Sequence, residues 1–485
     1  MNKDFIVSLT KHYRRFRDKD KHSDIFTHFL AALALKYIHE TYEKHFSKQI
    51  KASTIKSIHA LWNNLSPTGT ASRLDNSIEL LMAEDNEIFG KLFQSISFQK
   101  LTFQDSEIDR DTRLVQLLED LESTSFGSTD KSIDENGASA GYLIEKFTEE
   151  SFHKEGFLYT PRSIAGLMTQ MAGLESSHTV YDPAVGIATL LVQAAKTGSM
   201  KDTQLFGQDI QAEYVELARF HLFFNGIFNP TLEVADSLSR IRASKRTYDC
   251  VLVQPPFREK LLLPVNPRDF LQPVKRRRRS SISFSADNGT PTPARIRKQA
   301  DHLDFLTHMM DSVNENGKAI LIVPHGLLFK TGVAYQIRRK MINSNLVEAV
   351  IDLPPHVFYS SKINAAILVL NKNKSHNDIL FIDASGLYDS DRRRNKIRAS
   401  HSKQIMDAFR KFATVEGLSY RATQSETEND HNNYNLTAKR YVQSGGERAN
   451  GLNLRDMMNE IELLEKSLSD IQNRIKEEMA SFSQV

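Results

Sequence analysis

Hydrophobic residues in the first 122 positions recur every three or four residues, which is the period of an α-helix. The stretch from Phe26 to Tyr37 and the one that opens at Ser77 both gather their apolar side chains on one helical face. The pattern predicts a helical N-terminal domain over residues 1–122. Residues 123–140 are rich in Ser, Thr, Gly and Asp, offer little to bury, and indicate a linker.

From about Gly141 onward, short apolar runs alternate with amphipathic helical stretches, which is typical of a parallel sheet covered by helices. The candidate strands are all short and mostly apolar: Thr179–Tyr181, Gln204–Asp209, Thr231–Ala235, Asp249–Val253, Lys318–Val323, Leu346–Leu353 and Ala365–Leu370. They predict an α/β, doubly wound (Rossmann-like) domain over residues 141–445. A basic insertion, residues 261–300, interrupts this domain and contains the run Lys275–Arg279.

The C-terminal segment, residues 446–485, carries an apolar heptad pattern. The repeated positions are Leu454, Ile461, Leu468 and Ile475, with Met457, Leu464 and Ile471 three residues further on. This spacing predicts a long helix with one apolar seam, which needs a partner helix. A homodimer, packing on the chain's own helices and pairing with another subunit would each cover the seam.

The composition is that of a globular protein with more than one domain: 485 residues, 40% hydrophobic and 25% charged. Because 63 Lys and Arg stand against 60 Asp and Glu, any affinity for nucleic acid must come from local basic patches. The single cysteine, Cys250, excludes an internal disulfide framework and a cysteine-cluster metal site. We find no signal-like apolar core and no run that could span a membrane, and therefore expect a cytoplasmic protein.

Carboxylates follow three successive candidate strands. The first strand ends in Asp182 and Pro183, and Gly186 then precedes an apolar helix, at the place where a doubly wound sheet binds nucleotides. Asp209 ends the second strand and can accept both hydroxyls of a ribose, and Asp236 after the third can accept an adenine amino group. A tight strand-to-helix turn would explain the first motif alone, but three acidic strand ends favour a nucleotide-like ligand.

The fourth strand stops at Gln254, Pro255, Pro256 and Phe257. Two prolines cannot continue a central strand, so the turn presents Gln254 and Phe257 at the ligand-binding edge of the sheet. The side-chain carbonyl and a proline carbonyl can accept hydrogen bonds from an exocyclic amine, while the aromatic ring stacks on the base. A plain proline-rich turn is the other interpretation.

With these motifs in place, the chain resembles the methylation subunits of type I restriction–modification systems, which are adenine-N6 DNA methyltransferases. The resemblance runs from about Gly141 to Val442, and the order and spacing of its motifs make it specific. The motifs are Tyr159-Thr160-Pro161-Arg162, Asp182-Pro183-Ala184, Gly207-Gln208-Asp209, Pro255-Pro256-Phe257, Asp304-Phe305-Leu306, Val323–Phe329, Ala349–Pro354, Tyr434-Asn435-Leu436 and Arg440-Tyr441.

The resemblance implies a class I methyltransferase fold that binds S-adenosylmethionine at the first three strand ends, with Tyr159, Thr160 and Pro161 near its methionine portion. A DNA adenine would be flipped into a pocket floored by the prolines and Phe257, and no metal would be needed. The implied partners are DNA, a specificity subunit and a motor–nuclease restriction subunit, in a hetero-oligomer. The N-terminal domain and the C-terminal helix would serve the DNA clamp and subunit docking.

The chain also departs from the family pattern. Gln254 stands where Asn or Asp is usual, and one extra methylene moves the acceptor carbonyl by roughly 1 Å, which can cost on the order of a hundredfold in rate. The cofactor loop usually reads Gly-x-Gly-Gly, but here it reads Gly186–Thr189 without the later glycines. Phe157 replaces a usual Gln, and His221 a usual Asn.

These departures leave a second hypothesis open: a catalytically degenerate methyltransferase fold that acts as a DNA-binding scaffold of a defence complex. Methylation of a protein glutamine also uses a Pro-Pro-aromatic turn, but the enzymes that perform it lack such an N-terminal domain and heptad tail. The basic runs Lys275–Arg279 and Arg392–Arg398 are either solvated loops or contacts to DNA phosphates, and we favour DNA.

Overall fold

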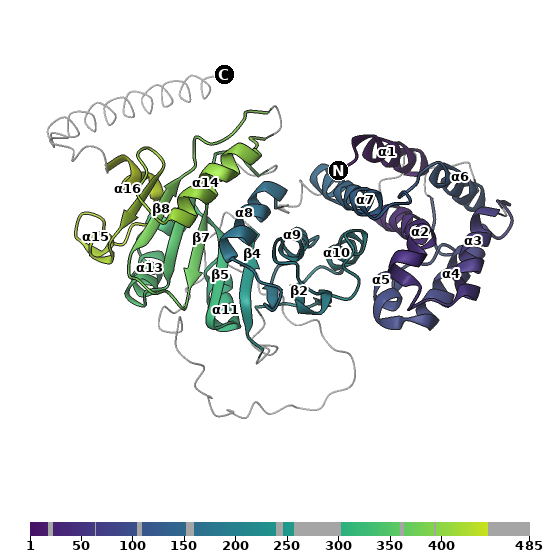
Figure 1. The fold of residues 1–485 in the computed structure, drawn as a ribbon, viewed down its shortest axis with the longest axis horizontal. Coiled ribbons are helices and arrows are strands. Elements are labelled where there is room, and N and C mark those ends of the chain that lie inside the picture. Colours follow the sequence, from purple (N-terminus) through teal and green to yellow (C-terminus); the bar gives the residue numbers. More distant parts are fainter. Residues whose placement is uncertain are drawn as a thin grey trace, which may run out of the picture.

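The computed structural model places the N-terminal helices at one end of the molecule and a large sheet with its covering helices at the other (Figure 1). The ranges that it describes are 1–17, 23–63, 65–103, 109–151, 160–238, 246–256, 302–358, 363–391 and 394–444. The basic insertion, residues 261–300, and the heptad segment, residues 446–485, lie outside these ranges, so both stay predictions.

The N-terminal domain is helical, as the sequence predicts. Its elements are α1 (Lys3–Arg17), α2 (Ser23–Thr41), the π-helical turn η1 (Tyr42–Phe46), α3 (Ala52–Asn63), α4 (Thr70–Glu84), a second turn η2 (Asn86–Gly90), α5 (Lys91–Phe93) and α6 (Arg110–Glu122). Helix α2 is buried from Ile25 to Ile38 and forms the centre of this domain. The aromatic ring of Tyr13 on α1 packs against those of Phe26 and Phe29 on α2.

Most of the segment interpreted as a linker, residues 123–140, is helical. Helix α7 (Asp130–Ser151) begins inside it and packs against α1 on one side. Two polar residues in this part of α7 are buried and hydrogen-bonded: the Asn136 amide donates to the carbonyls of Ser125 and Phe126, and the Ser139 hydroxyl donates to the carbonyl of Glu135. This helix packs inside the protein, but its small polar side chains have the composition that is typical of a linker.

The second part of the described chain contains a mixed sheet of nine strands in the order β3-β2-β1-β4-β5-β7-β6-β8-β9. The strands are β1 (Val180–Asp182), β2 (Leu205–Asp209), β3 (Thr231–Val234), β4 (Tyr248–Val253), β5 (Val313–Pro324), β6 (Val347–Asp352), β7 (Ala365–Asn371), β8 (Ile379–Asp383) and β9 (Ser419–Ala422). The first seven match the predicted runs. Strand β7 pairs antiparallel with both β5 and β6, and β9 pairs antiparallel with β8, whereas the other pairs are parallel.

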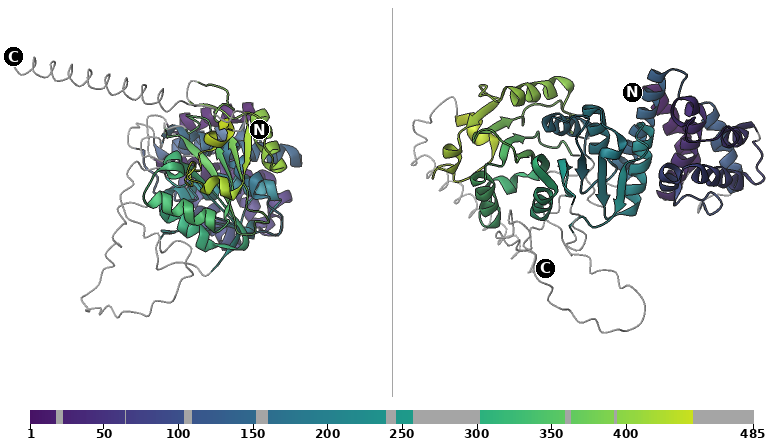
Figure 2. Two further views of the ribbon diagram at one scale, coloured as in Figure 1. Left: turned by 90° about the vertical axis from the view of Figure 1, so that its left-hand side faces the viewer. Right: turned by 60° about the horizontal axis from the view of Figure 1, so that its bottom comes forward.

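Helices cover both faces of the sheet, as Figures 1 and 2 show. Along β4 and β5 the side chains alternate between two hydrophobic cores, so Cys250 and Leu252 face one layer of helices while Val251 and Val253 face the other. The helices of the two layers are α8 (Arg162–Ala172), α9 (Thr189–Gly198) and α14 (Ala399–Lys411), and α11 (His302–Ser312), α13 (Val333–Asn343) and α16 (Ala438–Ser444). The doubly wound architecture is confirmed.

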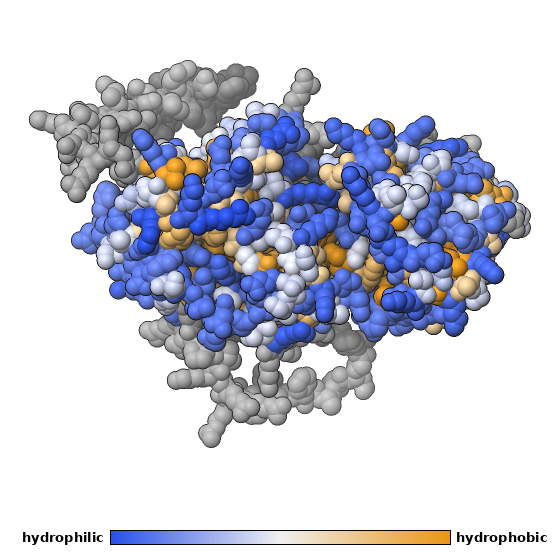
Figure 3. Space-filling model, in the orientation of Figure 1, coloured by the Kyte–Doolittle hydropathy of each residue, from blue (hydrophilic) through white to orange (hydrophobic). Residues whose placement is uncertain are grey.

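Short helical elements connect the remaining segments of this part. They are the 3-10 turn η4 (Asp202–Gln204), α12 (His325–Phe329) and α15 (Gln424–Glu428). The face seen in Figure 3 is largely hydrophilic, with hydrophobic side chains scattered in small groups. Within the described ranges, the helices are too short or too polar to cross a membrane.

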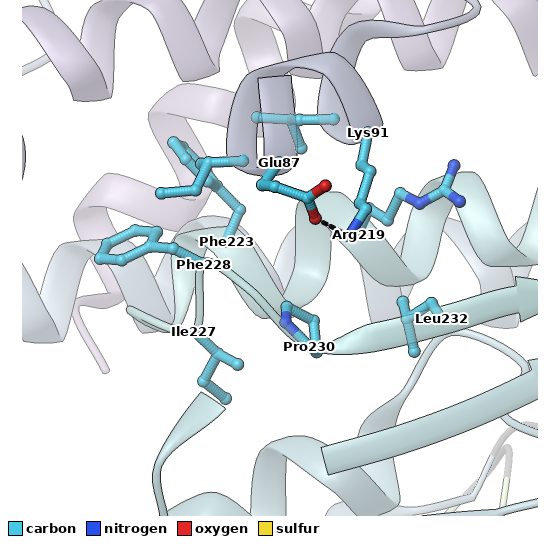
Figure 4. A pocket seen from close by; sticks show the side chains of 10 residues that line it. Glu87, Lys91, Arg219, Phe223, Ile227, Phe228, Pro230 and Leu232 are labelled. Carbon is cyan, nitrogen blue, oxygen red and sulfur yellow. Dashed lines mark hydrogen bonds and ion pairs between the residues drawn. The ribbon is translucent and has the colours of Figure 1, made fainter. Parts of the chain in front are cut away.

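Helix α10 (Ala212–Phe224) joins the two parts of the molecule. Val215 and Leu222 belong to the core beneath the sheet, whereas Phe220 and Phe224 belong to the core of the N-terminal domain. A helix with apolar residues on all sides is buried between two layers. Figure 4 shows this junction, where η2 and α5 lie over α10 at Arg219 and Phe223.

Candidate active site

The predicted site residues collect at one edge of the sheet. Strands β1, β2, β3 and β4 are mutually parallel, so their carboxyl ends lie at the same edge. Asp182 and Asp209 are the last residues of β1 and β2, and Asp236 follows β3 by two positions. Gln254 directly follows β4. This edge is where doubly wound sheets bind their ligands.

Asp182 is almost completely buried, with 1% of its surface exposed. One carboxylate oxygen accepts a hydrogen bond from the backbone N–H of Ala184, 3.0 Å away. Burial raises the pKa of Asp182 to about 8, the N–H of Ala184 opposes this shift, and the nearby charge of Asp209 adds to it. A cation close to this carboxyl group would stabilise its ionised form.

Asp209 contacts the loop that follows β1, residues 183–188, which we call the cofactor loop after the role that the family resemblance implies for it. Its Oδ2 accepts the backbone N–H of Gly186, and its Oδ1 accepts that of Gln211, each at 3.0 Å. Burial raises the pKa of Asp209, and these backbone hydrogen bonds oppose the shift. The N–H of Val185 also donates to the carbonyl of Gln208, so the loop lies directly on the end of β2.

The cofactor loop requires two unusual backbone positions. Gly186 has a φ of 50° and Ala188 a φ of 63°, and both values lie in the left-handed region that favours glycine. The loop also approaches β2 closely, because a Cβ on Gly207 would lie 2.7 Å from Cγ2 of Val185. Ala188 therefore adopts a glycine conformation at a position where the family pattern has glycine.

Asp236 and an unpredicted neighbour complete this end of the edge. Asp236 is half-buried and accepts the backbone N–H of Leu238 at 3.0 Å. Ile210, next to Asp209, has 58% of its surface exposed. An exposed apolar side chain beside this carboxylate offers a face for a planar ring, and its position directly after the strand-ending acid could have indicated this from the sequence.

The proline turn follows β4 at the same edge. Gln254 has 6% of its surface exposed, Pro255 is buried and Pro256 is half-buried. Phe257 and Tyr159 lie outside the described residues. Thr160 and Pro161 are buried and immediately precede α8, where Pro161 occupies the N-cap position.

A histidine and an aspartate lie close together further along this edge, and although both belong to motifs named above, their contact was not predicted. His325 follows β5 and Asp352 ends β6, and Nε2 of His325 lies 3.4 Å from Oδ1 of Asp352. Asp352 also accepts the backbone N–H of Lys439 at 3.2 Å. Burial raises the pKa of Asp352, and His325 opposes the shift. The strand register places Asp352 opposite Ala366.

In the described part of the chain, no three or more His, Cys, Asp or Glu side chains cluster so that they could hold a metal ion. The groups at the edge are carboxylates, an amide, backbone groups and apolar surfaces. This set suits an organic ligand with hydroxyl, amino and planar aromatic groups.

Comparison with known proteins relates this arrangement to a family. The family model described as "N-6 DNA Methylase" matches residues 131–450 of the chain. The chain is 26% identical over 450 residues to the type I restriction enzyme MpnII methylase subunit of Mycoplasma pneumoniae, a match that covers 88% of this chain and 80% of that protein. With the MjaIX methylase subunit of Methanocaldococcus jannaschii the identity is 26%, over 67% of this chain and 59% of that protein.

The fold is also that of a solved relative. The type I restriction–modification methyltransferase subunit of Streptococcus thermophilus superposes with a TM-score of 0.70, at 22% sequence identity, over 90% of this chain and 99% of that one. The likeness includes the helical N-terminal region and the mixed sheet.

Proposed function

The chain belongs to the N-6 DNA methylase family, and we propose that it transfers a methyl group from S-adenosylmethionine to N6 of an adenine flipped out of DNA. The observation that supports this most is the shared edge of four parallel strands. It puts Asp182, Asp209 and Asp236 in line with the turn of Gln254 and Pro255. A cofactor bound by these three aspartates would face a base bound at the turn after β4.

The residues present fit S-adenosylmethionine, which supplies an activated methyl group. Asp209 would accept the ribose hydroxyls, and Ile210 would pack on the adenine ring, whose amino group Asp236 would accept. Asp182 is a buried carboxyl whose raised pKa makes a nearby cation favourable, which suits the ammonium group of the methionine portion. Thr160 and Pro161 would border that portion, and Tyr159 would join them.

The turn after β4 would hold the base. The lone pair of adenine N6 is delocalised into the ring, so N6 is a weak nucleophile and needs to be aligned with the methyl group. The side-chain oxygen of Gln254 and the backbone carbonyl of Pro255 would accept its two hydrogens, Pro256 would complete the turn, and Phe257 would stack on the ring. Burial of Gln254 supports this role, because a buried carbonyl is positioned and partly shielded from water.

Partner subunits would determine which DNA sequence is methylated. The relatives are named as methylase subunits of type I restriction enzymes, so we propose a hetero-oligomer with a specificity subunit and, for cleavage, a motor–nuclease subunit. Alone, the chain should bind DNA weakly and without sequence preference. Full methylation of one defined sequence by the isolated chain would contradict this division of labour.

Calorimetry with S-adenosylmethionine, followed by transfer of labelled methyl groups to DNA with a specificity subunit present, tests the proposal. We expect saturable binding that Asp209→Ala abolishes. Asp378→Asn is the matched control, because Asp378 precedes β8 at the opposite edge of the sheet and pairs with Arg421. A folded protein that gives no heat at millimolar cofactor and transfers no methyl group would support the scaffold hypothesis instead.

A further inference from the structure

A buried polar cluster lies behind the cofactor loop, where three helices meet. It consists of Glu145 on α7, Arg162 on α8 and His221 on α10. His221 is 0% exposed, and the side chain of Glu145 is 1% exposed. Both carboxylate oxygens of Glu145 accept from Nε of Arg162 at 2.7 Å, and Oε1 lies 3.2 Å from Nε2 of His221. Buried charges are retained where partners fix them, and here the partners come from different helices.

The other nitrogen of His221 reaches the cofactor loop. Nδ1 lies 2.7 Å from the backbone oxygen of Ile187. A carbonyl oxygen only accepts, so Nδ1 carries the hydrogen and donates it. Ile187 stands between Gly186, which donates to Asp209, and Ala188 in its left-handed conformation. A continuous series of contacts therefore runs from Glu145 through the imidazole to the loop backbone.

The neighbouring helix is built to admit this ring. A Cβ on Gly141 of α7 would lie 2.9 Å from Cδ2 of His221, so glycine at this position makes room for the imidazole. The contact also has a reason in the loop. A non-glycine residue in the left-handed region is strained, and Ala188 has this conformation, so the loop needs contacts from outside to keep its shape.

We propose that His221, oriented by Glu145, is a positioning residue that holds the cofactor loop in its ligand-binding conformation. This inference rests on the proposed function, because it assigns S-adenosylmethionine to that loop. His221 acts through the backbone of Ile187 and does not touch the cofactor. Because α7 also packs against α1, the same contact connects the N-terminal domain to the cofactor loop.

Hydrogen–deuterium exchange of the loop and calorimetry with S-adenosylmethionine test the proposal together. We expect His221→Asn and Glu145→Gln each to speed amide exchange across residues 183–188 in the protein without ligand. His221→Asn should weaken cofactor binding about tenfold, the effect of losing the buried hydrogen bond to Ile187, and Glu145→Gln should weaken it in the same direction because it removes the charge that lies 3.2 Å from the imidazole. The double variant should bind about as weakly as either single variant, because the two residues act in series.

His28→Asn is the matched control. His28 is also a buried histidine with ring nitrogens facing two backbone oxygens, those of Asp24 and Ser97, but it lies in the N-terminal domain. Its replacement should lower the melting temperature and leave loop exchange and cofactor affinity unchanged. The proposal is overturned if the loop amides of His221→Asn exchange at the parent's rate. If His221→Asn does not fold, the same result in Glu145→Gln overturns it. If the two variants exchange the loop amides faster than the parent, but the parent itself binds no S-adenosylmethionine, the proposed function is overturned and the positioning role stands.

Discussion

The backbone N–H of Gly186 donates a hydrogen bond to Oδ2 of Asp209 across 3.0 Å, so the carboxylate that ends β2 holds the loop that follows β1. Oδ1 of the same side chain accepts the N–H of Gln211 at the start of α10. Each carboxylate oxygen has two lone pairs, so Asp209 can keep both contacts while it accepts ribose hydroxyls. Replacing it should therefore weaken cofactor binding by more than one hydrogen bond would.

Asp182→Asn should flatten the pH dependence of stability. Burial raises the pKa of Asp182 from its ordinary value of 3.8 to about 8, so between these values the folded protein binds a proton that the unfolded chain does not. The free energy of unfolding therefore falls as the pH rises through this window, by up to about 1.4 kcal/mol per pH unit. Urea unfolding at pH 4, 6 and 8 should show this slope in the parent and a smaller one in the variant.

Asp249 provides the contrasting case at the other end of β4. Burial disfavours its charged form, but hydrogen bonds from Thr179 and Asn314 outweigh burial and lower its pKa. Asp249→Asn should therefore remove stability that is present at neutral pH and lost as the pH falls through the lowered pKa. If both variants changed the slope in the same direction, the assignment for Asp182 would be wrong.

Ile210→Ser should weaken binding of S-adenosylmethionine about tenfold, because the exposed side chain would lose roughly 1.5 kcal/mol of apolar contact with the adenine ring. Val7→Ser is the control, since Val7 on α1 is also an exposed apolar residue but lies in the N-terminal domain. Calorimetry on both variants distinguishes them. Equal affinities for the parent and Ile210→Ser would place the ring elsewhere.

The sequence predicted β1 to β7, and most of these strands are buried on both faces, whereas three of the four residues of β3 are exposed. Apolar runs such as Lys318–Val323 can be recognised in the sequence because helices cover both faces of the sheet. Nearly every side chain of such a strand is therefore apolar. Strand β8 was missed because its short run lies in a polar stretch. Strand β9 (Ser419–Ala422) was missed because it is an edge strand, which needs little burial and therefore shows little apolar pattern. The start of helix α7 was interpreted as a linker because several of the residues it buries there, such as Asn136 and Ser139, are small and polar.

The site shows the same division. The acids at Asp182, Asp209 and Asp236 were predictable because parallel strands end at one edge, a rule that needs no tertiary detail. The contact of His325 with Asp352 depends on β7 lying between β5 and β6, an order that no local pattern encodes.

Gly137→Ala should destabilise the protein by about 1–3 kcal/mol, because the added Cβ would overlap the backbone oxygen of Phe224 where α7 packs on α10. Gly166→Ala is the matched control in α8, where nothing lies within 4 Å of the added carbon, and it should stabilise by about 0.5–1 kcal/mol. Chemical denaturation measures both changes. A loss of stability in the control, or none at Gly137, would contradict this account of the helix contact.

Gln254→Asn should lower the rate of methyl transfer into DNA by about a hundredfold, measured with labelled cofactor and a specificity subunit. The side chain is buried beside Pro255, so the turn is packed around a glutamine. Shortening it by one methylene withdraws the acceptor oxygen by roughly 1 Å, and misplacement of that size is costly in rate. Gln170→Asn is the control for the same chemical change, on the exposed face of α8.

The three outcomes at Gln254 separate the hypotheses because position decides the rate. A lower rate means that the pocket has adjusted to glutamine and that its oxygen binds the amino group of the base. A higher rate means that glutamine overshoots and that the chain descends from a faster enzyme with asparagine at this position. An unchanged rate in both Gln254→Asn and Phe257→Ala would remove the turn from the active site. If neither the parent nor the variant methylates DNA, the left-handed Ala188 becomes the position to restore, and Ala188→Gly should then improve cofactor binding.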